Sequence, residues 1–101
     1  MATTTSDARV LARFTAAPSM TTEKYDESIK RLKDSGNQWP PDGLAYHIAF
    51  SSGGNFRVSE IWDSQKQLET FGKHLMPILS DVGVELAGEP EVLEIHNIIQ
   101  R

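Results

Sequence analysis

The segment from Phe56 to Val82 constrains the fold more than any other part of the chain. Large side chains at every second position from Phe56 to Trp62 predict a β-strand. Ser64, followed three residues later by Gln67, is a capping-box pattern that marks the start of a helix. Apolar residues then recur at helical spacing as far as Val82, so one side of this helix must be buried. The segment therefore predicts a strand that passes through an N-cap directly into an amphipathic helix.

The rest of the chain adds three strands and one helix to this unit. The predicted strands are residues 9–15, 44–50 and 92–99, and the predicted helix is capped by Thr21 and ends before Gly36. This helix buries the stripe formed by Tyr25, Ile29 and Leu32. Residues 51–55, Ser-Ser-Gly-Gly-Asn, form the predicted hairpin loop. The order of elements predicts an α+β fold of the ferredoxin-like βαββαβ type, with a four-stranded antiparallel sheet.

The segment 37–43, Asn-Gln-Trp-Pro-Pro-Asp-Gly, is predicted to be a loop. Two prolines and a Pro-Asp-Gly turn exclude regular structure there. Trp39 in such a loop is more typical of a plug at the edge of the core than of a platform for a ligand.

Length and composition limit the kind of protein this can be. The 101 residues are enough for one domain, expected over residues 8–101, after a flexible tail at residues 1–7. A net charge of -4 argues against nucleic acid or an anionic membrane as a partner. The sequence has no cysteine, which excludes disulfides and thiolate chemistry. No apolar run is long enough to span a membrane and no signal peptide is recognisable, so a cytoplasmic location is expected.

The predicted sheet has apolar side chains on both faces, although two helices cover only one. Tyr46, Ile48 and Phe50 share a face of the second strand, and the last strand is apolar on both sides. We expect the uncovered face to pack against a second copy of the chain in a twofold-symmetric homodimer.

The chain also resembles a known family. The segment 60–64 leading into a helix with Phe71 and Leu75-Met76-Pro77, together with the length, the element order and the closing strand, is similar to the antibiotic biosynthesis monooxygenase-like (ABM-like) proteins. These belong to the dimeric α+β barrel superfamily, and the resemblance covers roughly residues 8–100. Families of this shape include cofactor-free quinone-forming monooxygenases, haem-degrading enzymes, isomerases and cyclases. The resemblance implies the fold and a homodimeric barrel without choosing among these reactions.

Glu60 is the residue of greatest chemical interest in the predicted hairpin. If Phe50 pairs with Phe56, Tyr46 lies opposite Glu60 on the face that carries Trp62. An acid on an otherwise apolar face is costly to bury unless it is paired or hydrogen-bonded. Glu60 is therefore either a general base or substrate anchor, or a structural carboxylate bonded to Tyr46 or to a basic group in the dimer interface.

Three histidines are the other candidates for proton transfer at neutral pH. His96 on the last strand is the favoured catalytic partner of Glu60. His47 either lies in the pocket or donates to Ser59 across the hairpin. His74 flanks the apolar stripe of the second helix, as a pocket residue or as a half-exposed packing residue.

The predicted substrate pocket lies on the helix-free face of the sheet, because that face lines the interior of the barrel. Its expected lining is Tyr46, Trp62, Phe50, His47 and His74. No two histidines have the spacing of a metal site, so neither a metal nor a cofactor is expected. Haem-degrading relatives carry an asparagine, a tryptophan and a histidine in the pocket. Here the first strand has no asparagine and Phe71 stands in the place of the tryptophan, with His74 as the remaining member.

The sequence thus favours a homodimeric ABM-like protein that binds a small apolar or aromatic molecule. If the protein is an enzyme, it is a cofactor-independent monooxygenase or isomerase that removes a proton in a pocket shielded from water. The alternative is a non-catalytic homodimer that uses the pocket to sense a ligand or fills it with side chains.

Overall fold

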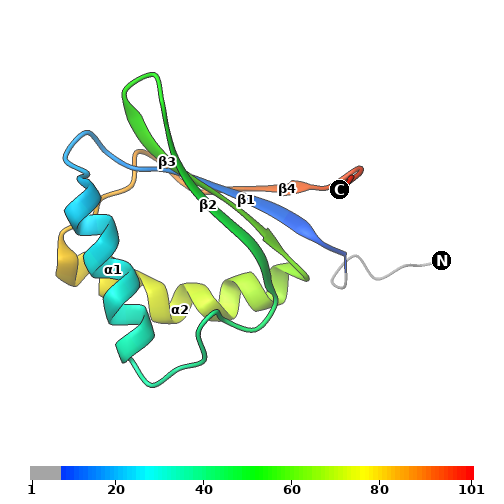
Figure 1. Cartoon of the computed structure of the whole chain (residues 1–101), viewed down its shortest axis with the longest axis horizontal. Coiled ribbons are helices and arrows are strands. Elements are labelled where there is room, and N and C mark those ends of the chain that lie inside the picture. The colour runs from blue at the N-terminus through cyan, green and yellow to red at the C-terminus, as the bar shows by residue number, and fades with distance from the viewer. Residues whose placement is uncertain (1–7) are drawn as a thin grey trace.

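The computed structural model describes residues 8–101 and has the predicted order of elements (Figure 1). The elements are β1 (Val10–Thr15), α1 (Thr22–Asp34), β2 (Leu44–Ser52), β3 (Asn55–Trp62), α2 (Gln65–Val82) and β4 (Glu91–Glu94). The sheet has the order β2-β3-β1-β4, and every neighbouring pair is antiparallel. The prediction of a ferredoxin-like α+β fold is therefore confirmed. The tail expected at residues 1–7 lies outside the described residues.

Both helices lie on one side of the sheet and enclose the core against it (Figure 1). The buried cluster consists of Val10, Ala12, Leu32, Trp62 and Phe71. Trp62 is fully buried, and its ring centre lies 5.4 Å from that of Phe71. Trp39 packs partly buried against this cluster, which confirms its predicted place as a plug at the edge of the core.

Local signals fix the ends of both helices. The Thr21 hydroxyl accepts a hydrogen bond from the Lys24 amide at 3.1 Å, and the Ser64 hydroxyl accepts one from the Gln67 amide at 3.2 Å. Gly83, with φ of 89°, ends α2 in the left-handed conformation that suits glycine. The predicted unit of strand, N-cap and helix is confirmed. No helix within residues 8–101 is long and apolar enough to cross a membrane.

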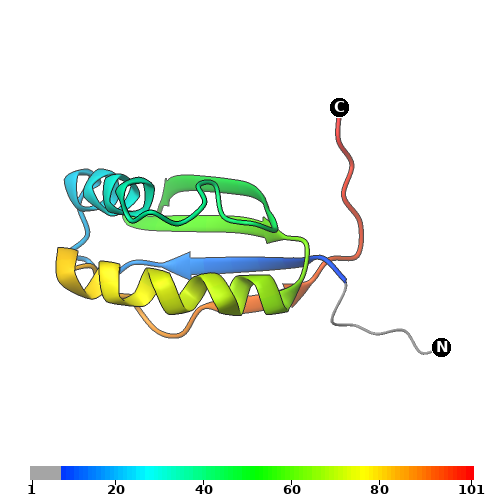
Figure 2. The ribbon, with the colours of Figure 1, turned by 90° about the horizontal axis from the view of Figure 1, so that it is seen from below.

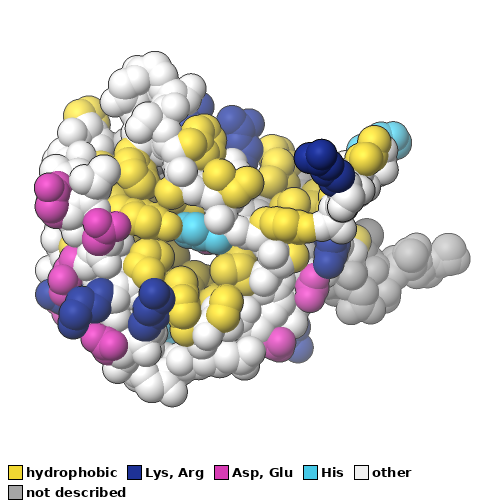
Figure 3. Space-filling view, viewed as in Figure 1, with side chains coloured by type: hydrophobic (Ala, Val, Ile, Leu, Met, Phe, Trp, Pro, Cys, Tyr) yellow, Lys and Arg dark blue, Asp and Glu magenta, His cyan; other side chains and the backbone are white. Residues whose placement is uncertain are grey.

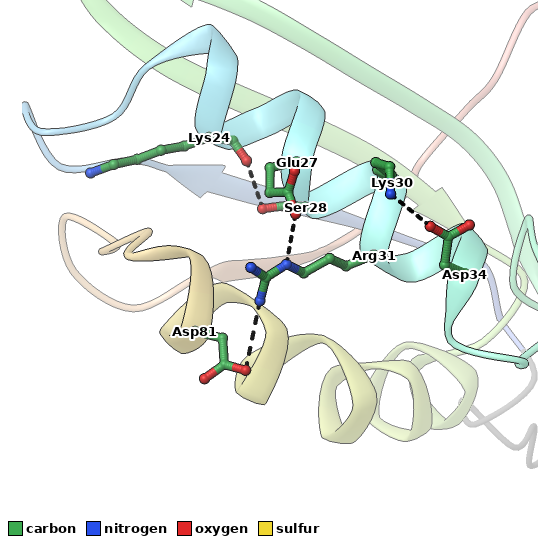
Figure 4. A network of polar contacts seen from close by, with 7 residues as sticks. All are labelled: Lys24, Glu27, Ser28, Lys30, Arg31, Asp34 and Asp81. Atoms are coloured by element: carbon green, nitrogen blue, oxygen red, sulfur yellow. Dashed lines mark hydrogen bonds and ion pairs between the residues drawn. The ribbon is translucent and has the colours of Figure 1, made fainter.

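A small network of charged side chains connects α1 to α2 (Figure 4). Arg31 donates from Nε to Glu27 on its own helix at 2.8 Å, and its Nη1 lies 3.7 Å from Oδ2 of Asp81 on α2. These side chains are substantially exposed, so water and salt screen their attraction. The two helices are therefore held mainly by the apolar contacts beneath this network.

The register of the β2–β3 hairpin differs from the predicted register by one residue. Phe50 lies opposite Arg57, and Ser52 lies opposite Asn55. The reason is the turn, because Gly53 and Gly54 both have positive φ and form a two-residue connection where a five-residue loop was predicted. With a shift of one residue, each β2 residue pairs with a β3 residue that the predicted register placed on the opposite face of the sheet. The register then shifts again between Leu44 and Tyr46, where a bulge interrupts the pairing.

The last strand is shorter than predicted. β4 ends at Glu94 because Glu94 pairs with Val10, the first residue of β1. Residues 95–101 form no strand in the described chain and lie on the side of the sheet away from the helices (Figure 2). Ile98 to Arg101 border a groove that is also lined by Tyr46 and Ile48 of the helix-free face. The prediction of a strand over residues 92–99 is therefore wrong in its second half.

The helix-free face of the sheet carries exposed apolar side chains. Tyr46, Ile48, Phe50 and Leu93 are 37% to 56% exposed. They share this face with Arg57, whose partners in the sheet are Thr15 and Phe50. The prediction of apolar side chains on both faces is confirmed for the described residues.

Candidate functional site

Four side chains between the sheet and α1 form a continuous hydrogen-bonded chain, which we call the relay. Oη of Tyr25 lies 2.7 Å from Nε2 of His47, and Nδ1 of His47 lies 2.6 Å from Oε2 of Glu60. Trp62 donates its indole N–H to Oε1 of Glu60 at 2.9 Å. The Glu60 carboxylate is therefore shared between Trp62 and His47, and His47 connects it to the Tyr25 hydroxyl.

Three elements bring the relay together. His47 on β2 and Glu60 on β3 are directly paired residues, so their side chains leave the sheet on the same face. Trp62 follows Glu60 by two residues on β3 and shares that face. Tyr25 comes from the beginning of α1, and its ring centre lies 5.9 Å from that of His47. Because His47 faces Glu60 only in the observed register, the relay depends on the two-residue turn at Gly53–Gly54.

The relay is largely shielded from water. The Glu60 side chain is 5% exposed and that of His47 is 24% exposed. Burying an ionised carboxylate is costly unless its oxygens are hydrogen-bonded, and both oxygens of Glu60 have a partner. With Glu60 ionised, Nδ1 of His47 carries the proton and Nε2 accepts from the Tyr25 hydroxyl, a tautomer assigned from the partners of the two nitrogens. A buried carboxylate thus orients a histidine towards a hydroxyl, as in the triads of hydrolases.

Tyr25 is held in its protonated form. Burial raises the pKa of Tyr25 above its ordinary value of 10.0, and the negative charges of Glu60 and Asp26 raise it further. At neutral pH the side chain is therefore a neutral hydroxyl. A proton that leaves this hydroxyl passes to Nε2 of His47, where the Glu60 carboxylate stabilises the imidazolium.

The relay borders a cavity of about 80 Å³ between the helices and the sheet, which we call the inner cavity. Its wall is almost entirely apolar and includes Phe14, Val58 and Leu75, with His47 as the one histidine among the described residues that line it. Figure 3 shows hydrophobic side chains gathered around a hollow that has a histidine at its centre. The molecule therefore offers an apolar space with a proton-transfer group in its wall.

The structure brings together three of the residues singled out in the sequence. Glu60 and Trp62 share a face as predicted, but it is the helix-covered face, so their predicted place on the helix-free face is wrong. His47 bonds to Glu60, so the suggested hydrogen bond from His47 to Ser59 is also wrong. Both differences follow from the helix packing and the shifted register.

The remaining predicted residues lie outside the relay. Tyr46 pairs with Ile61, so the prediction that it faces Glu60 is wrong, and Tyr46 and Phe50 lie on the helix-free face. His74 is exposed on α2 and lines a second groove, described below. His96 is exposed in the segment after β4. The roles suggested for His74 and His96 remain predictions.

Sequence reasoning missed Tyr25 as a member of the site. In the sequence Tyr25 fits the buried stripe of the first helix, where packing alone would explain its ring as well as it would explain a phenylalanine. The available signal is its hydroxyl, since a buried tyrosine normally needs a hydrogen-bond partner. The structure supplies that partner in His47.

Several solved structures share this architecture. A Deinococcus radiodurans protein provisionally named an antibiotic biosynthesis monooxygenase is 17% identical over 91% of this chain and 97% of that chain, with a TM-score of 0.57. A Caulobacter crescentus CB15 protein with the same provisional name is 16% identical over 90% of this chain and 89% of that chain, with a TM-score of 0.55. The chain has the ABM-like fold. A Bacteroides thetaiotaomicron protein of unknown function, described as a possible oxidoreductase, is 14% identical over 88% of this chain and 99% of that chain, with a TM-score of 0.59.

The ABM-like fold is shared at identities too low to carry chemistry from one protein to another. No protein-family model matches the chain, and comparison with curated proteins finds no match. Within residues 8–101 no three histidine, aspartate or glutamate side chains are grouped so that they could hold a metal ion. The chemistry of this protein must therefore be argued from its own relay and cavity.

Proposed function

We propose that this protein binds a small aromatic or otherwise apolar molecule with its reactive group in the inner cavity and removes a proton from that group through the relay. The observation that carries the proposal is the contact of 2.6 Å between His47 and the buried Glu60 at the wall of an apolar cavity. The apolar wall favours an uncharged ring, and the relay provides a path by which an acidic proton can leave it.

The proton transfer has a simple order. A ligand hydroxyl beside Tyr25 gives its proton to the tyrosine oxygen while Tyr25 gives its own proton to Nε2 of His47. The ligand becomes an anion hydrogen-bonded by Tyr25, and the imidazolium remains paired with Glu60. The apolar wall limits the contact of the anion with water.

Two outcomes of this step fit the fold. In a cofactor-free monooxygenation, a phenol and O₂ yield a quinone and water: one oxygen atom enters the ring, the other leaves as water, and the ring supplies every electron that O₂ takes up. In an isomerisation, the proton that left the hydroxyl of an enol returns to a carbon of the same ligand, which gives the ketone. Uptake of O₂ distinguishes the two reactions.

The test is a panel of activated phenols and enols, followed with an oxygen electrode and by mass analysis of the product. We expect turnover without added metal, and a loss of at least about 100-fold in kcat for both Glu60→Gln and His47→Gln, because general acid–base catalysis contributes about that much or more. Glu69→Gln, the same change on an exposed side chain of α2, is the control. Equal turnover in all variants would remove the relay from the mechanism.

Two further outcomes separate the other hypotheses. Loss of turnover in His96→Ala would bring the segment after β4 into the mechanism, as the sequence suggests. Binding in the inner cavity without any product would favour the non-catalytic ligand-binding protein.

We also propose that the protein is a homodimer packed through the helix-free face. Four exposed apolar side chains on this face, Tyr46, Ile48, Phe50 and Leu93, support a partner of the same kind. Arg57 on this face has a buried Nε without a hydrogen-bond partner within residues 8–101, and a facing surface can supply the acceptor. A cytoplasmic location remains our expectation from composition.

A further inference from the structure

A second space adjoins the inner cavity, and we call it the outer groove. It lies between the loop of residues 35–43 and α2, and its volume is about 390 Å³. Leu32, Trp39 and Phe71 line both spaces, so the same three side chains stand between them. The two spaces therefore adjoin at these side chains.

The two volumes show that the inner cavity alone is too small for a typical ligand. Its 80 Å³ is about half of the roughly 150 Å³ apolar cavity that accepts a benzene molecule in an engineered protein. Binding pockets for small molecules usually measure about 300–1,000 Å³. The outer groove is within that range, so the larger part of a ligand fits there.

The α2 side of the outer groove presents groups that suit an anion. Lys66, Thr70 and His74 are spaced by four residues and therefore share one side of the helix. Of the described residues, none forms an ion pair with Lys66, whose ammonium is free to take a carboxylate. Lys66 also lies in the first turn of α2, where the helix dipole favours negative charge.

The loop side of the outer groove is held against α2 by specific contacts. Gln67 donates from Nε2 to Oδ2 of Asp42 at 3.2 Å, and the Asp63 amide donates to the Gly43 carbonyl at 2.8 Å. The Asp42 carboxylate on the loop wall is thus bonded to Gln67 of α2. The two walls of the groove differ in charge, with Lys66 on the α2 side and Asp42 on the loop side.

We propose that the ligand is a phenolic carboxylic acid that spans both spaces, with its phenol hydroxyl and the adjoining edge of its ring in the inner cavity beside Tyr25, and the rest of the molecule in the outer groove, where its carboxylate lies beside Lys66. This inference rests on the proposed function, because it takes the ring to be the part that meets the relay. It adds the polar end of the ligand and the residues that recognise it.

The test is a ¹⁵N–¹H NMR titration with hydroxyphenylpropanoate, its uncharged methyl ester, and para-ethylphenol. We expect the acid to bind about fivefold more tightly than the ester, the factor that one partly exposed ion pair supplies. Lys66→Gln should remove this advantage, whereas Lys73→Gln, an exposed lysine of the same helix, should keep it.

The outcomes separate this inference from the proposed function. Equal affinity for acid and ester, or an unchanged advantage in Lys66→Gln, overturns the role of the outer groove. In that case para-ethylphenol should still shift the amides of Phe14 and Val58 in the wall of the inner cavity. If no probe shifts those amides, the proposed function itself fails, and the bipartite ligand fails with it.

Discussion

Glu60 can be buried because each of its oxygens is used, one by Trp62 and the other by His47. Its replacement by glutamine keeps the shape but places an amide N–H₂ where an acceptor stood. Nδ1 of His47 must then accept, Nε2 carries the proton, and the bond to Tyr25 reverses its direction. The loss of turnover expected in Glu60→Gln therefore comes from a change of the His47 tautomer, in a protein that still folds. The ¹⁵N shifts of the His47 ring report this tautomer directly.

Because of Tyr25, we expect the stability of the protein to depend on pH in the alkaline range. Its pKa is raised by folding above the 10.0 of the unfolded chain, so the folded state binds the proton more tightly. The contribution of Tyr25 to the stability is fully present below about pH 10, and it is lost as the pH rises through the pKa of Tyr25 in the folded protein. We expect the free energy of unfolding to fall more steeply above about pH 10 in the wild type than in Tyr25→Phe.

Urea unfolding at a series of alkaline pH values measures this difference. The other titrating groups are common to both proteins and cancel in the comparison. Parallel curves for the two proteins would show that folding does not change the affinity of Tyr25 for its proton.

Among the elements, the loop of residues 35–43 depends on its last residue, Gly43. Gly43 has φ of +91°, and a Cβ there would lie 2.5 Å from Cδ of Gln67. Gly36 has a similar φ of +87° but open space around it. Both Gly43→Ala and Gly36→Ala carry the backbone strain, and only Gly43→Ala also displaces Gln67 from Asp42.

We expect Gly43→Ala to lose about 1–3 kcal/mol more stability than Gly36→Ala, the usual cost of a forced contact in a packed site. Urea denaturation of the two variants provides the measurement. Equal losses would mean that Gln67 moves aside without cost.

The sequence predicts the elements well because each has a local signal, such as the Ser64 cap or the alternation of β3. It predicts the register poorly, since one choice about the turn at Gly53–Gly54 decides whether Glu60 faces Tyr46 or His47. The position of Tyr25 over His47 depends on how α1 docks on the sheet, which no local pattern encodes.

At the scale of the whole molecule, the helix-free face is the proposed site of assembly. Ile48 on this face and Met76 on α2 are almost equally exposed, at 56% and 52%. If the proposed dimer forms through the sheet, Ile48→Glu places a charge in the interface and Met76→Glu does not. We expect Ile48→Glu to be monomeric and Met76→Glu to remain dimeric.

Sedimentation velocity of the wild type and of both variants tests this expectation. A wild type that is monomeric at all concentrations would leave the helix-free face without the proposed partner. Dissociation in Met76→Glu alone would place the interface on α2.

The two tryptophans of the chain stand at different parts of the site. Trp62 donates to Glu60 deep in the relay, and Trp39 lines both the inner cavity and the outer groove. Indole emission depends on nearby charge and water, so Trp62 is an optical reporter of the relay and Trp39 is one of the boundary between the two spaces. With one tryptophan replaced by phenylalanine at a time, the emission of Trp39 would time the arrival of a ligand at that boundary, and the emission of Trp62 would time the arrival of its reactive end at the relay.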